Sequence, residues 1–436
     1  MTARTAPAAG RLVCRAAALS VATLLFAAGV AAAAAADWTE YRGPENDGRS
    51  AETAIAARFS AKPKLAWKVP VGQGFGTFAV AGDRAYLFVD RQSRETLVAL
   101  DAKTGREVWA RPVDQTITDR QGGSNPRSTP TVDGGNVYVL SVNLKLACFD
   151  AKTGKENWAK DVKAETKAPD LKWGNANSPV LDGDRIYVGG GGPGKSMMAF
   201  DKKTGDVAWA MGDEKMTHAS PTPATIHGVR QVIFFMQSGL VSVAADTGKE
   251  LWRAPFKFSV STAASPIVGQ GADANLVFCS AGYGVGSTVV EVSKEGDGFA
   301  AKELWMQKAE PDPQPNVNHW STPVYHDGHI YGIFGFKDYA DKGPGAPVRC
   351  LEMRTGTFKW QQPGFGSGGG TIFVDGHILA QGDAGRLALI EATPSGYKEK
   401  ASLKVPGQKF WSAAVVANGR IYTRSQNEAF CFDVGK

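Results

Sequence analysis

From about residue 65 to its end, the chain alternates short apolar runs with polar turns. Asp133–Val139 and Asp182–Val188 are typical, each with an Asp-Gly turn leading into a brief apolar run. Runs of this length between turn residues are typical of β-strands. No apolar period of 3.6 residues, the signature of helices, passes through these segments. The pattern therefore predicts an all-β protein of short antiparallel strands joined by hairpins.

The strands recur in units that end in tryptophan. The pattern Asp-x-x-Thr-Gly-x-x-x-Trp closes units at Asp101–Trp109, Asp150–Trp158 and Asp201–Trp209, with weaker copies ending at Trp252 and Trp360. Each unit also carries a Ser-Pro or Ser-Thr-Pro before its first strand, which gives four strands per unit. A repeat of 42 to 55 residues built from four strands predicts the blades of a β-propeller.

The two ends of the repeat region complement each other. The last unit reaches Asp433 without a closing tryptophan strand, and Leu65–Val71 around Trp67 reads as a strand with no unit before it. Pairing this N-terminal strand with the C-terminal blade would close the ring and remove exposed sheet edges. We therefore predict an eight-bladed propeller of four-stranded antiparallel blades over residues 61–436. Leu403 stands where a further tryptophan is expected.

The residues of the repeat have mechanical roles. Glycine can adopt positive φ in a tight turn, and the Asp and Thr side chains can bond to the turn backbone. Tryptophan can wedge between blades while its N–H finds a carbonyl. Cys148, Cys350 and Cys431 occupy one and the same slot of different units, so with Cys279 we expect buried free thiols rather than disulfides.

This repeat resembles the tryptophan-docking motif of the pyrroloquinoline-quinone (PQQ)-like propeller family. The resemblance covers about residues 60–436. The family includes quinoprotein alcohol and glucose dehydrogenases as well as the non-enzymatic envelope propeller BamB. The resemblance implies the propeller fold but leaves open which of these functions applies, because one fold hosts both.

Residues 1–36 read as a secretory signal peptide, with Arg4, Arg11 and Arg15 before the apolar run Ala16–Val30 and a small-residue cleavage site before Asp37. The alternative is an uncleaved anchor. Removing the segment lowers the net charge from +6 to +3 and leaves no basic cluster for nucleic acid and no membrane span. We expect a periplasmic or extracellular monomer, with an irregular segment at residues 37–60.

Chemistry is expected at the mouth of the central funnel, in the loop that enters the first strand of each unit. These loops carry Asn125, Arg127, Trp173, Asn175, Asn177, His218, Thr262, Asn318, His319, Trp320, Ser367, Lys409 and Trp411. A planar quinone carboxylate could stack on the tryptophans and pair with Arg127 or Lys409. The cofactor candidates are Arg127, Asn177, His218, His319, Trp320, Lys409 and Trp411, and the alternative is a set of loops that bond to one another around water.

Several parts of a quinoprotein dehydrogenase are missing from the sequence. By resemblance such an enzyme needs a carboxylate base and usually a Ca²⁺ ion, and these loops contain no carboxylate. The nearest are Asp114, Asp119, Asp213, Glu214, Glu310 and Asp312. His218 and His319 lie in different units with no third ligand, so no metal site is predicted.

The sequence supports two candidate functions. The first is a periplasmic propeller that binds or scaffolds envelope proteins or extended peptides, through long loops such as Ala309–Val317 and Lys337–Pro347. The alternative is a PQQ- and Ca²⁺-dependent dehydrogenase of an alcohol or sugar. No catalytic residue can be assigned from the sequence.

Overall fold

The computed structural model describes residues 1–3, 5, 36–60, 63–119, 123–124, 126–308, 317–335 and 345–435, and residues 35–436 form one compact unit. Most of the predicted signal peptide, Asn125 and most of the loops Ala309–Val317 and Lys337–Pro347 lie outside the described residues, as do Glu310 and Asp312. No helix in the described part is long and apolar enough to cross a bilayer.

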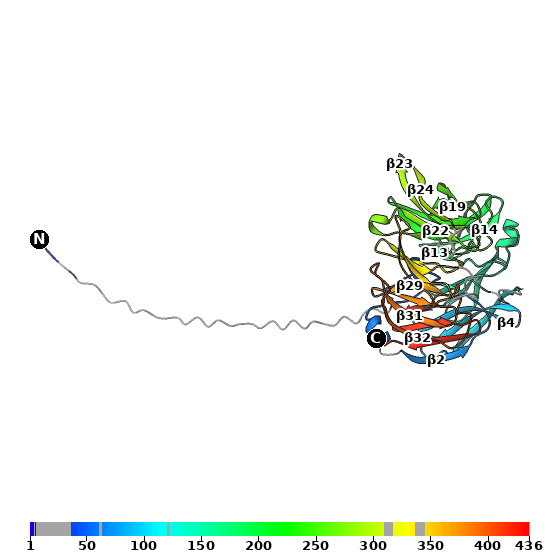
Figure 1. The fold of residues 1–436 in the computed structure, drawn as a ribbon, viewed down its shortest axis with the longest axis horizontal. Coiled ribbons are helices and arrows are strands. Elements are labelled where there is room, and N and C mark those ends of the chain that lie inside the picture. Colours follow the sequence, from blue (N-terminus) through cyan, green and yellow to red (C-terminus); the bar gives the residue numbers. More distant parts are fainter. Residues whose placement is uncertain are drawn as a thin grey trace. The chain divides into compact units, whose positions relative to one another are not determined.

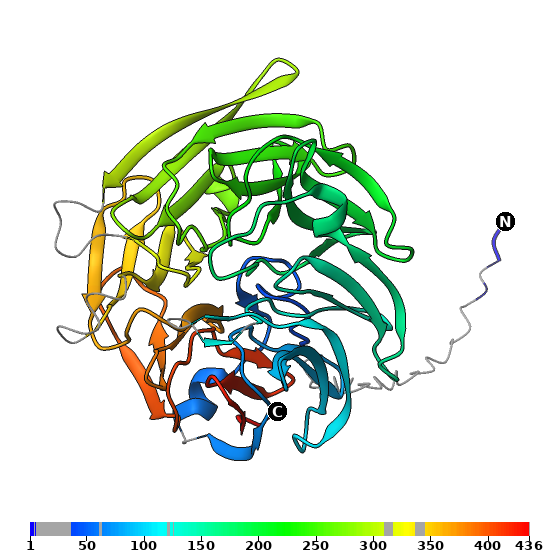
Figure 2. The same ribbon diagram turned by 90° about the vertical axis from the view of Figure 1, so that its right-hand side faces the viewer.

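Eight antiparallel sheets follow one another around a centre, as predicted (Figures 1 and 2). Blade 1 contains β3 (Ala79–Ala81), β4 (Arg84–Arg91), β5 (Arg94–Asp101) and β6 (Glu107–Gln115). Blade 2 contains β9 (Thr131–Asp133), β10 (Asn136–Leu140), β11 (Lys145–Asp150) and β12 (Glu156–Asp161). Blade 3 contains β13 (Val180–Asp182), β14 (Arg185–Gly192), β15 (Lys195–Asp201) and β16 (Val207–Met211). Blade 4 contains β17 (Thr222–Ile226), β18 (Val229–Met236), β19 (Gly239–Ala244) and β20 (Glu250–Pro255).

The second half of the chain continues the series. Blade 5 contains β21 (Ile267–Val268), β22 (Leu276–Ala281), β23 (Gly286–Glu295) and β24 (Gly298–Lys308). Blade 6 contains β25 (Val324–His326), β26 (His329–Ile333), β27 (Val348–Glu352) and β28 (Phe358–Gln362). Blade 7 contains β29 (Gly370–Val374), β30 (His377–Gln381), β31 (Arg386–Glu391) and β32 (Glu399–Lys404). Blade 8 contains β33 (Val415–Ala417), β34 (Arg420–Arg424) and β35 (Glu428–Asp433), together with β2 (Lys64–Pro70), which pairs antiparallel with β35.

A few short elements lie outside the eight sheets of four. They are β1 (Arg49–Ser50), the pair β7 (Thr118–Asp119) and β8 (Gly123–Ser124), the helices α1 (Ile55–Ser60) and α2 (Val162–Thr166), and a 3₁₀ turn at Gly271–Asp273. β1 adds in parallel to β29 and makes blade 7 five-stranded.

The closing tryptophan of one blade sits on the turn of the next. The indole N–H of Trp109 donates to the carbonyl of Ala151 at 3.2 Å, and a Cβ added to Gly154 would lie 2.7 Å from the Trp109 ring. Trp67, Trp158, Trp209, Trp305 and Trp360 donate in the same way to Ala102, Lys202, Ala245, Met353 and Thr393. Each of these acceptors precedes a glycine of its blade by three residues. A Cβ added to that glycine would press on the indole in every case except Gly396 beside Trp360, so the other glycines leave room for the ring.

The turn side chains and the cysteines have the expected places. The Asp150 carboxylate accepts hydrogen bonds from the backbone and hydroxyl of Thr153, which closes the turn. Cys148, Cys350 and Cys431 each face the tryptophan of their own blade across the sheet, and with Cys279 they are free and buried. The slot therefore holds a small apolar group beside the indole.

The expectation for Leu403 is wrong by two residues. In other blades the ladder slips just after the residue that pairs with the tryptophan, and in blade 7 this pair is Leu389 with Ala401. Ala401 therefore holds the tryptophan position. Helix α1 packs against β32 there, and its buried Ile55 and Phe59 belong to the same apolar cluster as Ala401. A helix from the N-terminal segment thus supplies apolar volume where blade 7 has no indole.

The segment Trp38–Ser50 crosses the centre of the ring (Figure 2, dark blue). Trp38 forms an antiparallel bridge with Val80 of blade 1, and the carbonyl of Thr39 accepts from Val132 of blade 2. The segment next contacts Leu181 of blade 3, Gln270 of blade 5 and Thr322 of blade 6, and ends as β1 on blade 7. It therefore plugs one face of the ring.

We predict that Gly154→Ala destabilises the fold more than Gly134→Ala. Both glycines have positive φ, +70° and +56°, but a Cβ at Gly134 meets nothing within 4 Å. The backbone cost of about 1–2 kcal/mol is common to both, whereas overpacking against Trp109 adds about 1–3 kcal/mol. Denaturant unfolding measures the difference, and equal losses in the two variants would contradict the seating of the indole on the turn.

Candidate functional site

A cavity of about 340 Å³ lies at the centre of the ring. The loops that enter the first strands of all eight blades contribute to its lining, as the sequence predicts. The lining residues are Tyr41, Arg42, Phe75, Gly76, Thr77, Arg127, Thr129, Trp173, Ala176, His218, Ser220, Ser261, Ala263, Tyr283, His319, Trp320, Ser321, Thr322, Gly369, Gly370, Ile372, Trp411, Ser412 and Ala413.

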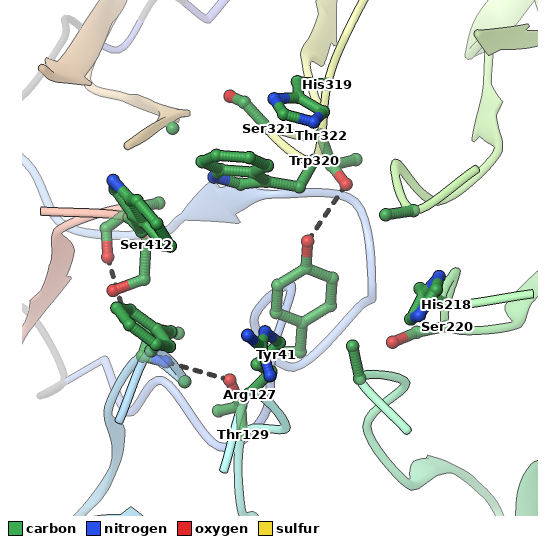
Figure 3. A pocket seen from close by; sticks show the side chains of 18 of the residues that line it. Tyr41, Arg127, Thr129, His218, Ser220, His319, Trp320, Ser321, Thr322 and Ser412 are labelled. Carbon is green, nitrogen blue, oxygen red and sulfur yellow. Dashed lines mark hydrogen bonds between the residues drawn. The ribbon is translucent and has the colours of Figure 1, made fainter. Parts of the chain in front are cut away.

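The N-terminal plug contributes Tyr41 and Arg42 to this lining. The Tyr41 hydroxyl lies 3.0 Å from the Thr322 hydroxyl, and Figure 3 shows its ring rising between Trp320 and Arg127. The buried Arg42 guanidinium donates to the carbonyls of Thr322 and Pro323 at 3.3 and 2.7 Å. Because Tyr41 and Arg42 of the plug line the cavity and bond to the loop that enters blade 6, the plug closes the cavity on its side and forms its floor.

Aromatic rings form a continuous wall. Phe75 stacks on Trp411 with centroids 4.7 Å apart, Trp411 lies 4.8 Å from Trp320, and Trp320 lies 3.9 Å from His319. Tyr283 meets His319 edge-on at 5.1 Å and is 42% exposed. The indole N–H of Trp411 donates to Asp383 at 2.9 Å, whereas that of Trp320 is buried and has no acceptor among the described residues.

Cations lie against these rings. The Arg127 guanidinium carbon lies 5.5 Å from the centroid of Phe75, the Lys409 ammonium 5.3 Å from that of Trp411, and the Lys172 ammonium 4.7 Å from that of Trp173. Such contacts stabilise a cation through the ring quadrupole. Arg127 also donates to the carbonyl of Trp173 at 3.0 Å, and burial lowers its pKa to about 10, so it is a cation at neutral pH.

His218 is a neutral side chain in this setting. Burial lowers its pKa to about 4, and its Nε2 lies 2.8 Å from the carbonyl of Lys172, to which it must donate. The ring therefore joins the loops of blades 3 and 4 and carries no charge at pH 7.

Of the seven residues predicted to bind a cofactor, five line the cavity and two do not. Arg127, His218, His319, Trp320 and Trp411 line the cavity, as the sequence led us to expect. Asn177 lies behind the lining, where its side chain bonds to Asn175. Lys409 is not among the lining residues and places its ammonium over the ring of Trp411.

Several members of the site were missed. Phe75, Tyr41 and Arg42 come from segments before the first complete unit, and Tyr283 comes from a hairpin rather than a loop that enters a first strand. The glycine-flanked aromatic at Gly282–Gly284 was the one available signal for Tyr283.

Carboxylates lie behind the wall rather than in it. No Asp or Glu occurs among the described residues that line the cavity. Glu95 is fully buried and accepts from the backbone of Val142, and burial raises its pKa well above the ordinary value. Within the described ranges, no group of three His, Cys, Asp or Glu side chains could hold a metal ion.

Comparison with known proteins places the chain in a family. The family model described as "Outer membrane protein assembly factor BamB" matches residues 52–126 and 94–333. The chain belongs to this family. No curated protein matches it.

Solved structures share the fold at low identity. BamB from Moraxella catarrhalis aligns with a TM-score of 0.56 and 12% identity, over 85% of this chain and 99% of that one. Quinohemoprotein alcohol dehydrogenase from Comamonas testosteroni aligns with a TM-score of 0.62 and 16% identity, over 92% and 80%. The computationally designed Ika8 protein aligns with a TM-score of 0.58 and 10% identity, over 85% and 99%. At such identities these likenesses show the fold alone.

We predict that the stability of the plug depends on pH through Glu40. This side chain is 3% exposed, accepts from Asn46 and from the backbone of Leu181, and burial raises its pKa from 4.5 to about 8. The folded state holds this proton more tightly than the unfolded state, so stability is full below pH 4.5 and falls as the pH rises through 8.

The neutral variant Glu40→Gln removes this contribution to the pH dependence of stability. Between pH 5 and pH 9 the wild-type free energy of unfolding should fall by a few kcal/mol more than that of the variant, since each pKa unit corresponds to about 1.4 kcal/mol. Glu156→Gln, at an exposed position on β12, serves as the control and should follow the wild type. Parallel pH profiles for the wild type and Glu40→Gln would contradict the assignment.

Proposed function

We propose that this protein is a β-propeller of the cell envelope that binds other proteins, in keeping with the assembly role named for its family. Residues 1–36 are the proposed signal that takes the chain to the periplasm, where it acts as a monomer. The observation that carries the proposal is the hydrogen bonding of three polar side chains that line the cavity. Arg42, Arg127 and His218 all donate to backbone carbonyls of the ring itself.

Such a wall suits binding better than catalysis. A general base needs a suitable pKa and hydrogen-bond reach of its substrate. Here the His218 imidazole is hydrogen-bonded to the ring and burial lowers its pKa to about 4, so it is not a free base for a substrate. Aromatic rings beside cations are instead typical of surfaces that anchor a partner.

PQQ is the cofactor of the alternative function, and the site fits it only in part. The flat rings of Trp320 and Trp411 and the cations Arg127 and Lys409 suit a planar polycarboxylate. Asn177, His218 and His319 complete the proposed set. The lining supplies neither the oxygen ligands that Ca²⁺ prefers nor a carboxylate base among its described residues. The residues therefore do not fit the chemistry of a quinoprotein dehydrogenase, and no catalytic step is assigned.

Titration with PQQ and Ca²⁺ separates the two functions. We expect no reduction of an electron-accepting dye with alcohols or sugars as substrates, and a one-to-one complex with a defined envelope protein that re-forms from the two purified components. Saturable PQQ binding accompanied by substrate-dependent dye reduction would overturn the proposal.

A further inference from the structure

The mouth of the cavity has the chemistry of a peptide-docking site. We propose that it captures an extended segment of a partner protein, which inserts one aromatic side chain into the cavity and places carboxylates beside Lys172 and Lys409. This inference rests on the proposed protein-binding function and names the chemistry of the partner segment.

The aromatic wall explains why the partner segment is expected to insert an aromatic side chain. The ladder from Phe75 through Trp411 and Trp320 to His319 offers ring faces and edges to an inserted ring. The buried indole N–H of Trp320 lacks an acceptor among the described residues, and buried donors normally have one. Binding sites for small ligands span about 300–1,000 Å³, so a cavity of about 340 Å³ with a floor suits a single side chain better than a threaded chain.

Lys172 and Lys409 explain why the partner segment is expected to carry carboxylates. Each lies on the face of a tryptophan that lines the cavity, and neither forms an ion pair with another described residue. No carboxylate among the described lining residues offsets them. An acidic segment would therefore meet complementary charge on both of these loops, which favours it over a basic one.

The backbone at the mouth is held in an unusual conformation. Trp173, Tyr283 and Lys409 have φ values of +68°, +51° and +56°, although none of them is glycine, Asn or Asp. A non-glycine residue in this region costs of order 1–3 kcal/mol and persists where the surroundings hold it. Three such residues on three loops around one opening indicate a mouth preorganised for a ligand, which lowers the entropic cost of docking.

The chain itself shows that the ring accepts extended peptide. Segment Trp38–Ser50 lies across the channel, bridges Val80 through Trp38, and adds β1 in parallel to β29. First strands thus present backbone groups toward the channel, and recognition by added strand pairing is a common mode. Since the plug covers one face, a partner segment would enter from the face of Lys172 and Lys409.

Fluorescence anisotropy with the purified protein tests this inference. The probe is a labelled peptide with blocked ends, Ser-Gly-Asp-Trp-Glu-Gly-Ser, and the matched peptides replace Asp and Glu by Asn and Gln, or Trp by Ala. We expect saturable binding of the first peptide, at least roughly tenfold weaker binding of the neutral peptide, and no saturation with the alanine peptide. Binding should also weaken with added salt, because Lys172 is exposed and Lys409 is partly exposed.

The protein variants localise the effect. Lys172→Gln combined with Lys409→Gln should weaken the acidic peptide roughly tenfold. Lys398→Gln, at the residue just before β32 and not among the residues that line the cavity, should bind as the wild type. Equal binding of the three peptides, no binding of any, or an unchanged affinity in the double variant overturns the inference. Tight binding of free indole-3-acetate, equal to that of the peptide, also overturns it in favour of a small-molecule site.

Failure of this inference is separable from failure of the proposed function. If the double variant forms the purified partner complex as well as the wild type does, proteins bind elsewhere on the ring and the mouth is not the docking site. If neither forms a complex, the proposed function fails, and the peptide titration still decides the chemistry of the mouth.

Discussion

Most blades are held to the next by an indole ring that rests on the glycine of a turn. The same contact gives the indole N–H a carbonyl three residues before that glycine, so one residue supplies both buried apolar area and a satisfied donor. Because neighbouring blades share this contact, the first strands take fixed places around the centre. The geometry of the cavity therefore depends on contacts made at the outer strands.

The ring tolerates two departures from this contact. In blade 4 the indole of Trp252 donates to Gln231 of its own blade, so the donor is satisfied without the neighbouring turn. In blade 7 the position belongs to Ala401, and Ile55 and Phe59 of α1 fill the volume. The N-terminal segment thus substitutes for a missing indole at one point and forms the floor of the cavity at another.

Much of this could be predicted because the repeat is local. The turn of Asp150–Gly154 and its tryptophan lie within one unit, so their spacing fixes strands and hairpins, and repetition fixes the ring. Arg127, His218 and Trp320 could be placed in the cavity from their position before a first strand. Tyr41 and Arg42 could not, because their contacts with Thr322 span 281 and 280 residues and no repeat precedes them. Lys409 was placed in the right loop, but its side chain lies over the ring of Trp411 rather than in the lining of the cavity.

Hydrogen–deuterium exchange of the plug tests most directly whether the N-terminal segment is part of the ring. The amides of Trp38 and Gly48 donate to Val80 and Arg42 carbonyls, and the segment lies in the channel among first strands. We predict that peptides covering residues 38–50 exchange as slowly as those covering β3 and β9, and far more slowly than the exposed β23–β24 turn. Exchange of residues 38–50 as fast as that turn would contradict the plug, the floor of the cavity and the direction from which a partner enters.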